Sequence, residues 1–215
     1  MSLFITFEGV EGSGKSTQIR LLHQHLVDNG VPVLMTREPG GCPIADAIRA
    51  ILLDPANQEM TARTELLLYA AARAQHVEQL IRPALAAGKT VLCDRFIDAT
   101  TAYQGGGRGL DAALITRLNT VATDGLTPDL TLLLDFTAEE GVERARRRNQ
   151  QGNQLDEGRF ELETFAFHRR VRQGYLELAA REERFRVIDA SGSAAQVAAR
   201  IAAAVDLFLA HWSRP

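Results

Sequence analysis

Eight consecutive residues near the start of the chain carry the clearest chemistry. They match the pattern Gly-x-x-x-x-Gly-Lys-Ser/Thr in full and are Gly9, Val10, Glu11, Gly12, Ser13, Gly14, Lys15 and Ser16. In such a loop, glycines let backbone N–H groups turn towards an anion, and the following helix adds the positive end of its dipole. Lys15 can reach the outer phosphates of a nucleoside triphosphate, and the Ser16 hydroxyl can ligate Mg²⁺. The stretch therefore predicts a loop that binds a nucleoside triphosphate.

The residues around this loop supply the strand and the helix that it needs. An apolar stretch at 3–7 comes before it, and apolar residues recur every three to four positions across 15–28. This spacing predicts a helix directly after the loop. Lys15 is one of only two lysines among the 24 basic residues, the other being Lys89. A compact ammonium is thus kept where a phosphate loop requires one.

An acidic residue at the end of a buried strand is the usual partner of the magnesium ion in such sites. Two apolar runs end in this way, at Asp94 and at Asp135. Asp94 is followed directly by Arg95, so one strand end would deliver an acid and a planar cation together. We therefore expect Asp94 and Ser16 to hold the metal, with Asp135 as the alternative. Either acid could instead only cap a strand end or a helix start.

A second group of polar residues lies where another substrate could bind. The sequence at 36–41 follows a predicted strand, and ligands of open α/β sheets bind outside the carboxyl ends of the strands. Arg37 could contact that substrate, and Glu38 could hold an arginine in place or accept a hydrogen bond from the substrate. The alternative is that the two residues form a solvated ion pair in a turn. Tyr69 and Arg73 are four positions apart on a predicted helix. They could stack on and hydrogen-bond a base, or form a packed helix edge.

Arginines cluster before a polar stretch in the last third of the chain. Arg146, Arg147 and Arg148 end a predicted helix over 138–149, and the sequence at 149–154 is Asn-Gln-Gln-Gly-Asn-Gln. An arginine-rich helix end beside a flexible loop is typical of a lid that closes over phosphates and brings in a cation. The alternative is a solvated helix face, whose C-terminus favours arginine.

Strand and helix signals alternate along the chain. Short apolar runs predict strands buried on both faces, over 3–7, 31–36, 90–93, 130–136 and 185–189. Helical periodicity predicts helices over 15–28, 44–53, 62–86, 98–104, 111–123, 138–149, 160–183 and 194–211. The glycine-rich sequence at 105–109 predicts a mobile loop. We expect one α/β domain over 1–215, with a doubly wound parallel sheet of five strands and helices on both faces.

The composition argues against several classes of protein. The 215 residues carry a net charge of −3, which argues against a general nucleic-acid binder. No run of 18 apolar residues occurs and no basic stretch with a cleavage site opens the chain, so we expect no membrane span and no signal peptide. Cys42 and Cys93 form neither a disulfide framework nor a metal spacing, which fits a reducing cytoplasm.

Four stretches together resemble the thymidylate kinase family, in order and at suitable spacing. They are Phe-Glu-Gly through Thr at 7–17, Thr-Arg-Glu-Pro-Gly-Gly at 36–41, Asp-Arg-Phe at 94–96 and Ala-Tyr-Gln-Gly at 102–105. The resemblance runs over about 3–190. It implies the phosphate-loop fold of nucleoside monophosphate kinases and transfer of the γ-phosphoryl of ATP to dTMP with Mg²⁺. It also implies a cytoplasmic location and a homodimer.

The resemblance assigns roles to individual residues. The ATP set that it implies is the loop 9–16 together with Thr17. The acceptor set that it implies is Arg37, Glu38, Arg49, Tyr69, Arg73, Arg95, Thr100, Tyr103 and Gln104. In that set Arg95 clamps the phosphate of dTMP, Tyr69 stacks on thymine and Arg73 bonds its carbonyl oxygen. Tyr103 lies near the deoxyribose, where a 2′-hydroxyl would be crowded.

The phosphate loop carries no arginine at its variable positions, which resembles the bacterial members of the family. In those members the lid supplies the catalytic arginine, so we expect a lid at about 146–160 and Arg148 as the first choice, before Arg146 and Arg147. The lid departs from the common pattern, because residues 158–161 read Gly-Arg-Phe-Glu where many members read Asp-Arg-Phe-Glu.

Two other kinds of function stay open on the sequence alone: another nucleoside monophosphate or deoxynucleoside kinase of the same architecture, and a nucleotide-dependent switch. A nucleoside kinase would need a base for the acceptor hydroxyl, and Glu38 could serve; the arginines Arg37 and Arg95 favour an acceptor that already carries phosphate. A nucleotide-dependent switch would hydrolyse its nucleotide slowly without an acceptor. The sequence has no Asn-Lys-x-Asp motif, which counts against a GTPase switch.

Overall fold

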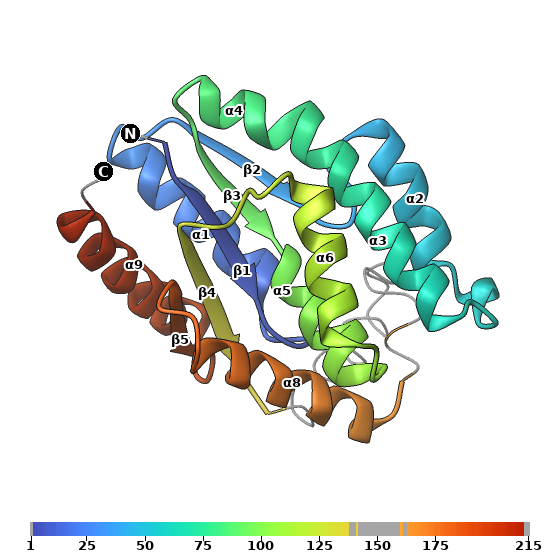
Figure 1. Cartoon of the computed structure of the whole chain (residues 1–215). Coiled ribbons are helices and arrows are strands. Elements are labelled where there is room, and N and C mark those ends of the chain that lie inside the picture. The colour runs from blue at the N-terminus through green and yellow to red at the C-terminus, as the bar shows by residue number, and fades with distance from the viewer. Residues whose placement is uncertain (1, 138–140, 142–159, 161–162, 213–215) are drawn as a thin grey trace.

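A parallel sheet of five strands forms the centre of the molecule (Figure 1). The computed structural model describes residues 2–137, 141, 160 and 163–212. The strands are β1 (Phe4–Glu8), β2 (Val33–Arg37), β3 (Thr90–Asp94), β4 (Leu130–Asp135) and β5 (Phe185–Asp189). Their order is β2-β3-β1-β4-β5, and every neighbouring pair is parallel. The prediction of a doubly wound parallel sheet is confirmed.

Helices connect the strands and cover both faces of the sheet (Figure 1). In the described part they are α1 (Lys15–Asp28), α2 (Pro43–Leu53), α3 (Ala62–His76), α4 (Arg82–Ala86), α5 (Ile97–Thr100), α6 (Ala112–Thr123), α8 (Phe165–Ala179) and α9 (Ala194–His211). A π-helical turn at Val77–Ile81 joins α3 to α4, so the helix predicted over 62–86 is continuous. The helix predicted over 160–183 is shorter, since Thr164 caps the start of α8. The helix predicted over 138–149 lies outside the described residues, apart from Gly141.

The side chains of the central strand β1 alternate between the two faces. Ile5 and Phe7 pack in one hydrophobic cluster with apolar residues of α1 and α9. Phe4 packs on the other face with Val77 and Ile81. Glu8, the last residue of the strand, shares the face of Phe4 by the two-residue period of a strand. The strand therefore ends by placing a buried carboxyl beneath the helices of that face.

The glycines at 105–107 are not in the mobile loop that the sequence predicts. They continue α5 as a π-helical turn, Thr101–Gly107, that packs against α8. A Cβ on Gly107 would come within 2.5 Å of the ring of Phe167, and one on Gly106 within 3.1 Å of the Arg170 carbonyl oxygen. For 105–107 the prediction was wrong because these glycines serve close helix packing instead of a turn; Arg108 and Gly109 lie outside the helical segment.

Helix α9 is the one helix in the described part that is long and apolar enough to cross a membrane. Length and composition alone make it so, and 17% of the helix is buried inside the structure. Val197, Ile201 and Val205 lie in the core cluster beside α1. Arg200 donates to the Asp189 carbonyl oxygen at 2.7 Å, and Asp206 lies 3.0 Å from a His25 nitrogen. These contacts are those of a helix that covers the sheet.

Candidate active site

The phosphate loop has the conformation that its sequence predicts. It leaves β1 at Gly9 and ends where α1 begins at Lys15, and Gly9, Gly12 and Gly14 all have positive φ angles. A Cβ on Gly9 would lie 2.5 Å from the Leu134 carbonyl oxygen, so this turn requires glycine. The Lys15 ammonium is buried over the loop, where it donates to the carbonyl oxygens of Gly9 and Val10 at 3.0 and 2.9 Å.

The serine and the acid that were expected to hold the metal lie next to each other. The Ser16 hydroxyl is 3.4 Å from Asp94 Oδ2. Asp94 Oδ1 is buried and has no hydrogen-bond partner among the described residues. Asp135, the alternative, is engaged by two hydrogen bonds from Arg172, at 2.7 and 2.8 Å. Because hard divalent cations prefer oxygen ligands, Ser16 and Asp94 fit a metal site better than Asp135 does.

A pocket beside the phosphate loop brings most of the predicted acceptor residues together. Eight predicted residues line it: Glu11, Glu38, Arg49, Tyr69, Arg95, Thr100, Tyr103 and Gln104. Four more lining residues were not predicted as binding residues: Pro39, Leu53, Ala99 and Phe160. The lining includes the aromatic rings of Tyr69, Tyr103 and Phe160 and the guanidinium groups of Arg49 and Arg95. The pocket therefore suits a flat ring joined to an anionic group.

A wider cleft continues from this pocket to the metal pair. It shares Glu38, Arg49 and Arg95 with the pocket, and it also contains Ser16 and Asp94. Arg37 lies in this cleft, with its side chain 58% exposed and 3.5 Å from Asp46. The end of the phosphate loop and the arginines of the acceptor pocket therefore face one continuous space. Two phosphorylated ligands could meet there.

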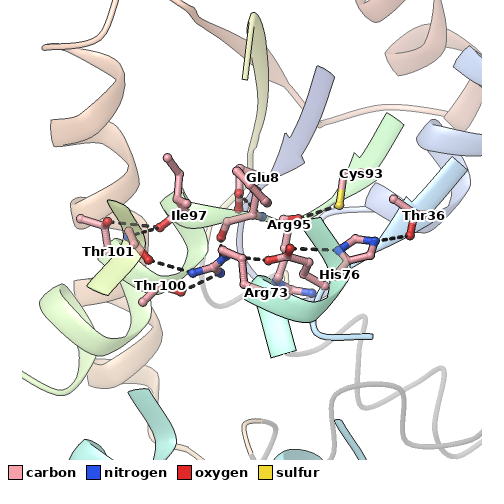
Figure 2. A network of polar contacts seen from close by, with 12 residues as sticks. Glu8, Thr36, Arg73, His76, Cys93, Arg95, Ile97, Thr100 and Thr101 are labelled. Atoms are coloured by element: carbon pink, nitrogen blue, oxygen red, sulfur yellow. Dashed lines mark hydrogen bonds and ion pairs between the residues drawn. The ribbon is translucent and has the colours of Figure 1, made fainter. Parts of the chain in front are cut away.

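Arg73 lies behind the pocket wall, in the polar network of Figure 2. It is 2% exposed and donates to Glu38 Oε2 at 2.8 Å, Asn119 Oδ1 at 2.8 Å, the Phe96 carbonyl oxygen at 3.0 Å and Thr100 Oγ1 at 2.9 Å. Glu38 thus holds an arginine in place, one of the two roles expected for it. The contact of Arg73 with a base stays a prediction. The arginine is a packed part of the wall in this structure.

Three elements meet at Tyr103, behind the phosphate loop. Its hydroxyl donates to Glu11 Oε1 at 2.6 Å, and Arg95 Nη2 donates to the same hydroxyl at 3.3 Å. Its ring packs edge-on against Phe160, with the ring centres 5.6 Å apart. His168 of α8 is 1% exposed, and its Nδ1 lies 3.1 Å from Glu11 Oε2. The acid of the phosphate loop is therefore fixed by groups from distant parts of the chain.

Gln104 and Thr100 line the pocket next to an acid that sequence reasoning missed. Gln104 is 1% exposed and donates to Glu65 Oε1 at 2.9 Å. Arg108 donates to both oxygens of Glu65, at 3.2 and 3.1 Å. Glu65 lies four residues before Tyr69 on α3, so the helical period places both on one face of the helix. This four-residue spacing is the sequence signal that could have identified Glu65.

The arginines expected from the lid lie outside the described residues. They are Arg146, Arg147 and Arg148. Of the segment 146–160, only Phe160 is described, and its ring lies 6.4 Å from that of Tyr69. The last residue of the segment therefore lines the pocket beside Tyr69.

Comparison with known proteins agrees with this geometry. The family model described as thymidylate kinase matches residues 7–201. The thymidylate kinase of Geotalea uraniireducens is 62% identical over 206 residues, which are 95% of this chain and 97% of that protein. That of Trichlorobacter lovleyi is 58% identical over 94% of this chain and 96% of its own. A crystal structure of thymidylate kinase from Ehrlichia chaffeensis superposes with a TM-score of 0.76 at 34% identity, covering 95% of this chain and 98% of that one. The chain belongs to the thymidylate kinase family.

Proposed function

We propose that the chain transfers the γ-phosphoryl group of ATP to dTMP, giving ADP and dTDP for the synthesis of dTTP. The observation that carries this proposal is the continuous cleft. It joins the phosphate loop and the Ser16–Asp94 pair to a pocket with Tyr69, Gln104 and Arg95 on its walls. In this proposal the thymine ring binds beside Tyr69 and Gln104, and the phosphate of dTMP is directed towards Arg95.

The reaction needs positioning and charge neutralisation more than proton transfer. The phosphate oxygen of dTMP is already a nucleophile at neutral pH, so a general base is unnecessary. In this proposal Lys15 of the phosphate loop acts on the phosphates of ATP, and Arg95 and Arg37, which line the cleft, act on the phosphate of dTMP. Ser16 and Asp94 would hold Mg²⁺, which neutralises charge on the phosphates when it is bound. We further propose one kinase domain with a lid at about 146–160 from which Arg148 stabilises the moving phosphoryl.

The position of Glu38 favours this reaction over nucleoside phosphorylation. Its two oxygens are engaged by Arg73 at 2.8 Å and by His76 at 3.0 Å, and its side chain is 3% exposed. A carboxylate held in this way is poorly placed to take a proton from a 5′-hydroxyl. The built acceptor pocket also argues against a nucleotide switch, which has no second substrate.

A panel of acceptors tests the proposal. ADP formation from ATP and Mg²⁺ is measured with dTMP, dUMP, UMP, dCMP, dGMP, AMP and thymidine, each with and without a chelator. We expect strong stimulation by dTMP, weaker by dUMP, little by UMP, and loss of activity without Mg²⁺. Stimulation by thymidine alone would replace the proposal with a nucleoside kinase, and slow ADP formation indifferent to every acceptor would favour a switch.

Tyr103 is expected to select deoxyribose by crowding a 2′-hydroxyl. Its ring is 5% exposed and fixed between Phe160, Phe167 and Tyr175. Tyr103→Ala should lower the preference for dUMP over UMP, measured as the ratio of kcat/KM values, by roughly 10-fold or more. Tyr103→Phe is the matched variant that removes only the hydroxyl. If both variants keep the wild-type ratio, the steric explanation fails.

We propose that the protein is a cytoplasmic homodimer. Large apolar side chains are exposed on α2, α3 and α6, which pack side by side: Ile44, Ile51, Leu67 and Val121. Exposed apolar groups gathered on neighbouring helices are typical of an interface. Sedimentation velocity tests the dimer: a species of twice the chain mass is expected at micromolar concentration, and a monomer there would refute it.

A further inference from the structure

Glu8 is a fully buried carboxyl for which the proposed reaction has no role. It is the last residue of β1 and 0% exposed, directly before the phosphate loop. Its Oε1 accepts the backbone N–H of Phe96 at 2.8 Å, and its Oε2 accepts the hydroxyl of Tyr175 at 2.7 Å. Both bonds run to residues more than 80 positions away in the chain. A buried carboxyl with two such partners fixes the segments that carry them.

The segment that Glu8 holds contains Arg95 in an unusual backbone conformation. Arg95 has a φ angle of 69°, in the left-handed region that is unfavourable for residues with a Cβ. Hydrogen bonds fix the chain on both sides of it. The Arg95 N–H donates to the Phe7 carbonyl oxygen at 2.9 Å, and the next N–H, of Phe96, donates to Glu8. Figure 2 shows Glu8 and Arg95 together in this network.

This conformation decides where the guanidinium group of Arg95 points. The side chain lines both the pocket and the cleft, with Nη2 3.3 Å from the Tyr103 hydroxyl and 3.7 Å from Glu11 Oε1. An extended backbone at this position would turn the Cα–Cβ bond, and the guanidinium with it, in another direction. The strained φ is therefore part of the site, and it persists only because the surroundings hold it.

We propose that Glu8 is a positioning residue for the acceptor phosphate. It holds Arg95 in the left-handed conformation by accepting the N–H of Phe96, and it connects this segment to α8 by accepting the hydroxyl of Tyr175. The inference rests on the proposed function, in which Arg95 binds the phosphate of dTMP. Glu8 itself touches no substrate. Its effect should therefore appear in the kinetics of dTMP and not in those of ATP.

The surroundings of Glu8 favour its protonated form. Burial, followed by the charge of Asp98, raises its pKa from 4.5 to about 8. The hydrogen bonds from Tyr175 and Phe96 and the charge of Arg95 lower the pKa, but their effect is smaller. Asp98 is in turn paired with Arg184 at 2.7 Å, and the nearby Cys93 thiol has a raised pKa and carries no charge. Glutamine, which is neutral and keeps one carbonyl acceptor, should therefore replace Glu8 well.

This pKa gives the stability of the protein a predictable pH dependence. Below pH 4.5 the carboxyl is protonated in both the folded and the unfolded chain. Between pH 4.5 and 8 the unfolded chain releases the proton and the folded chain keeps it, so the free energy of unfolding falls as the pH rises. Glu8→Gln should remove this fall. In urea titrations at pH 5, 6, 7 and 8, wild type should lose stability relative to Glu8→Gln; a constant difference would refute the protonated Glu8.

Glu8→Met tests the positioning role, because it keeps the length of the side chain and removes both acceptors. We expect kcat/KM for dTMP to fall by about 10²-fold, with the KM for ATP close to that of wild type. Glu8→Gln should restore most of the activity towards dTMP. In an Arg95→Ala background, Glu8→Met should change the dTMP kinetics no further, since its target is already gone.

Thr6→Val is the matched control on the same strand. It removes a buried hydrogen bond of 2.9 Å to Thr131 of β4 and leaves both acceptor oxygens of Glu8 in place. It should lower the melting temperature without a selective rise in the KM for dTMP. If Glu8→Met does not fold, Glu8→Asp, which is one methylene too short to reach Phe96, replaces it.

The outcomes separate this inference from the proposed function. A wild-type chain that does not phosphorylate dTMP would refute the function. If the wild type is active, two results would refute only the role of Glu8. One is unchanged dTMP kinetics in the folded Glu8 variants, and the other is additive effects of Glu8→Met and Arg95→Ala.

Discussion

Replacing Lys15 by alanine is expected to lower kcat by about 10²–10³-fold. The ammonium is the one cation of the phosphate loop; it is buried and donates to the carbonyl oxygens of Gly9 and Val10. Its loss removes a charge that acts on the transferring group, so turnover should suffer more than the affinity for dTMP.

Lys89→Ala provides the control for this prediction, because Lys89 is the only other lysine of the chain and is exposed in the turn before β3. Steady-state kinetics with ATP and dTMP should show near-normal turnover for Lys89→Ala. Near-normal turnover for a folded Lys15→Ala protein would refute the assignment of the phosphate loop.

Arg95→Ala is expected to lower kcat/KM for dTMP by about 10³-fold. The guanidinium lies where the pocket opens into the cleft, and its side chain is 16% exposed. The variant would leave the dianionic phosphate of dTMP without its cationic partner and would remove a neighbour of Tyr103 and Glu11. Binding of ATP depends on the loop 9–16 and should change little.

Arg186→Ala is the matched control, because Arg186 lies on the edge strand β5 and donates to the nearby carbonyl oxygens of Glu183 and Phe185. Isothermal titration of dTMP into both variants separates binding from turnover. Equal dTMP affinity in Arg95→Ala and Arg186→Ala would contradict the role of Arg95.

Features encoded by neighbouring residues could be predicted from the sequence. The phosphate loop needs a strand, a glycine turn and a helix in immediate succession, and all three follow one another over 3–28. Short apolar runs predict the strands to within one or two residues, because a central parallel strand is buried on both faces. The prediction of burial on both faces was wrong for β2 and β5, since these edge strands are partly exposed. Asp94 could be preferred over Asp135 because Arg95 follows it, and the structure shows Asp135 paired with Arg172.

Contacts between distant segments could not be predicted in this way. Glu8 and Phe96 are 88 positions apart, and Glu11 and His168 meet only because α8 packs over the loop. Nothing in the local sequence marks a carboxyl as the partner of a backbone N–H so far away. The prediction of a loop at 105–107 was wrong for the same reason. A turn and a close helix contact both require glycine, and only the position of Phe167 in the fold distinguishes the two cases.

Transfer of a labelled phosphoryl group tests the central claim most directly. The protein is incubated with Mg²⁺, dTMP and ATP labelled at the γ-phosphate, and the labelled products are separated. Because Ser16 and Arg95 line the same cleft, we predict that the label appears in dTDP, at a rate that matches ADP formation. Label in inorganic phosphate, at the same rate with and without dTMP, would contradict it.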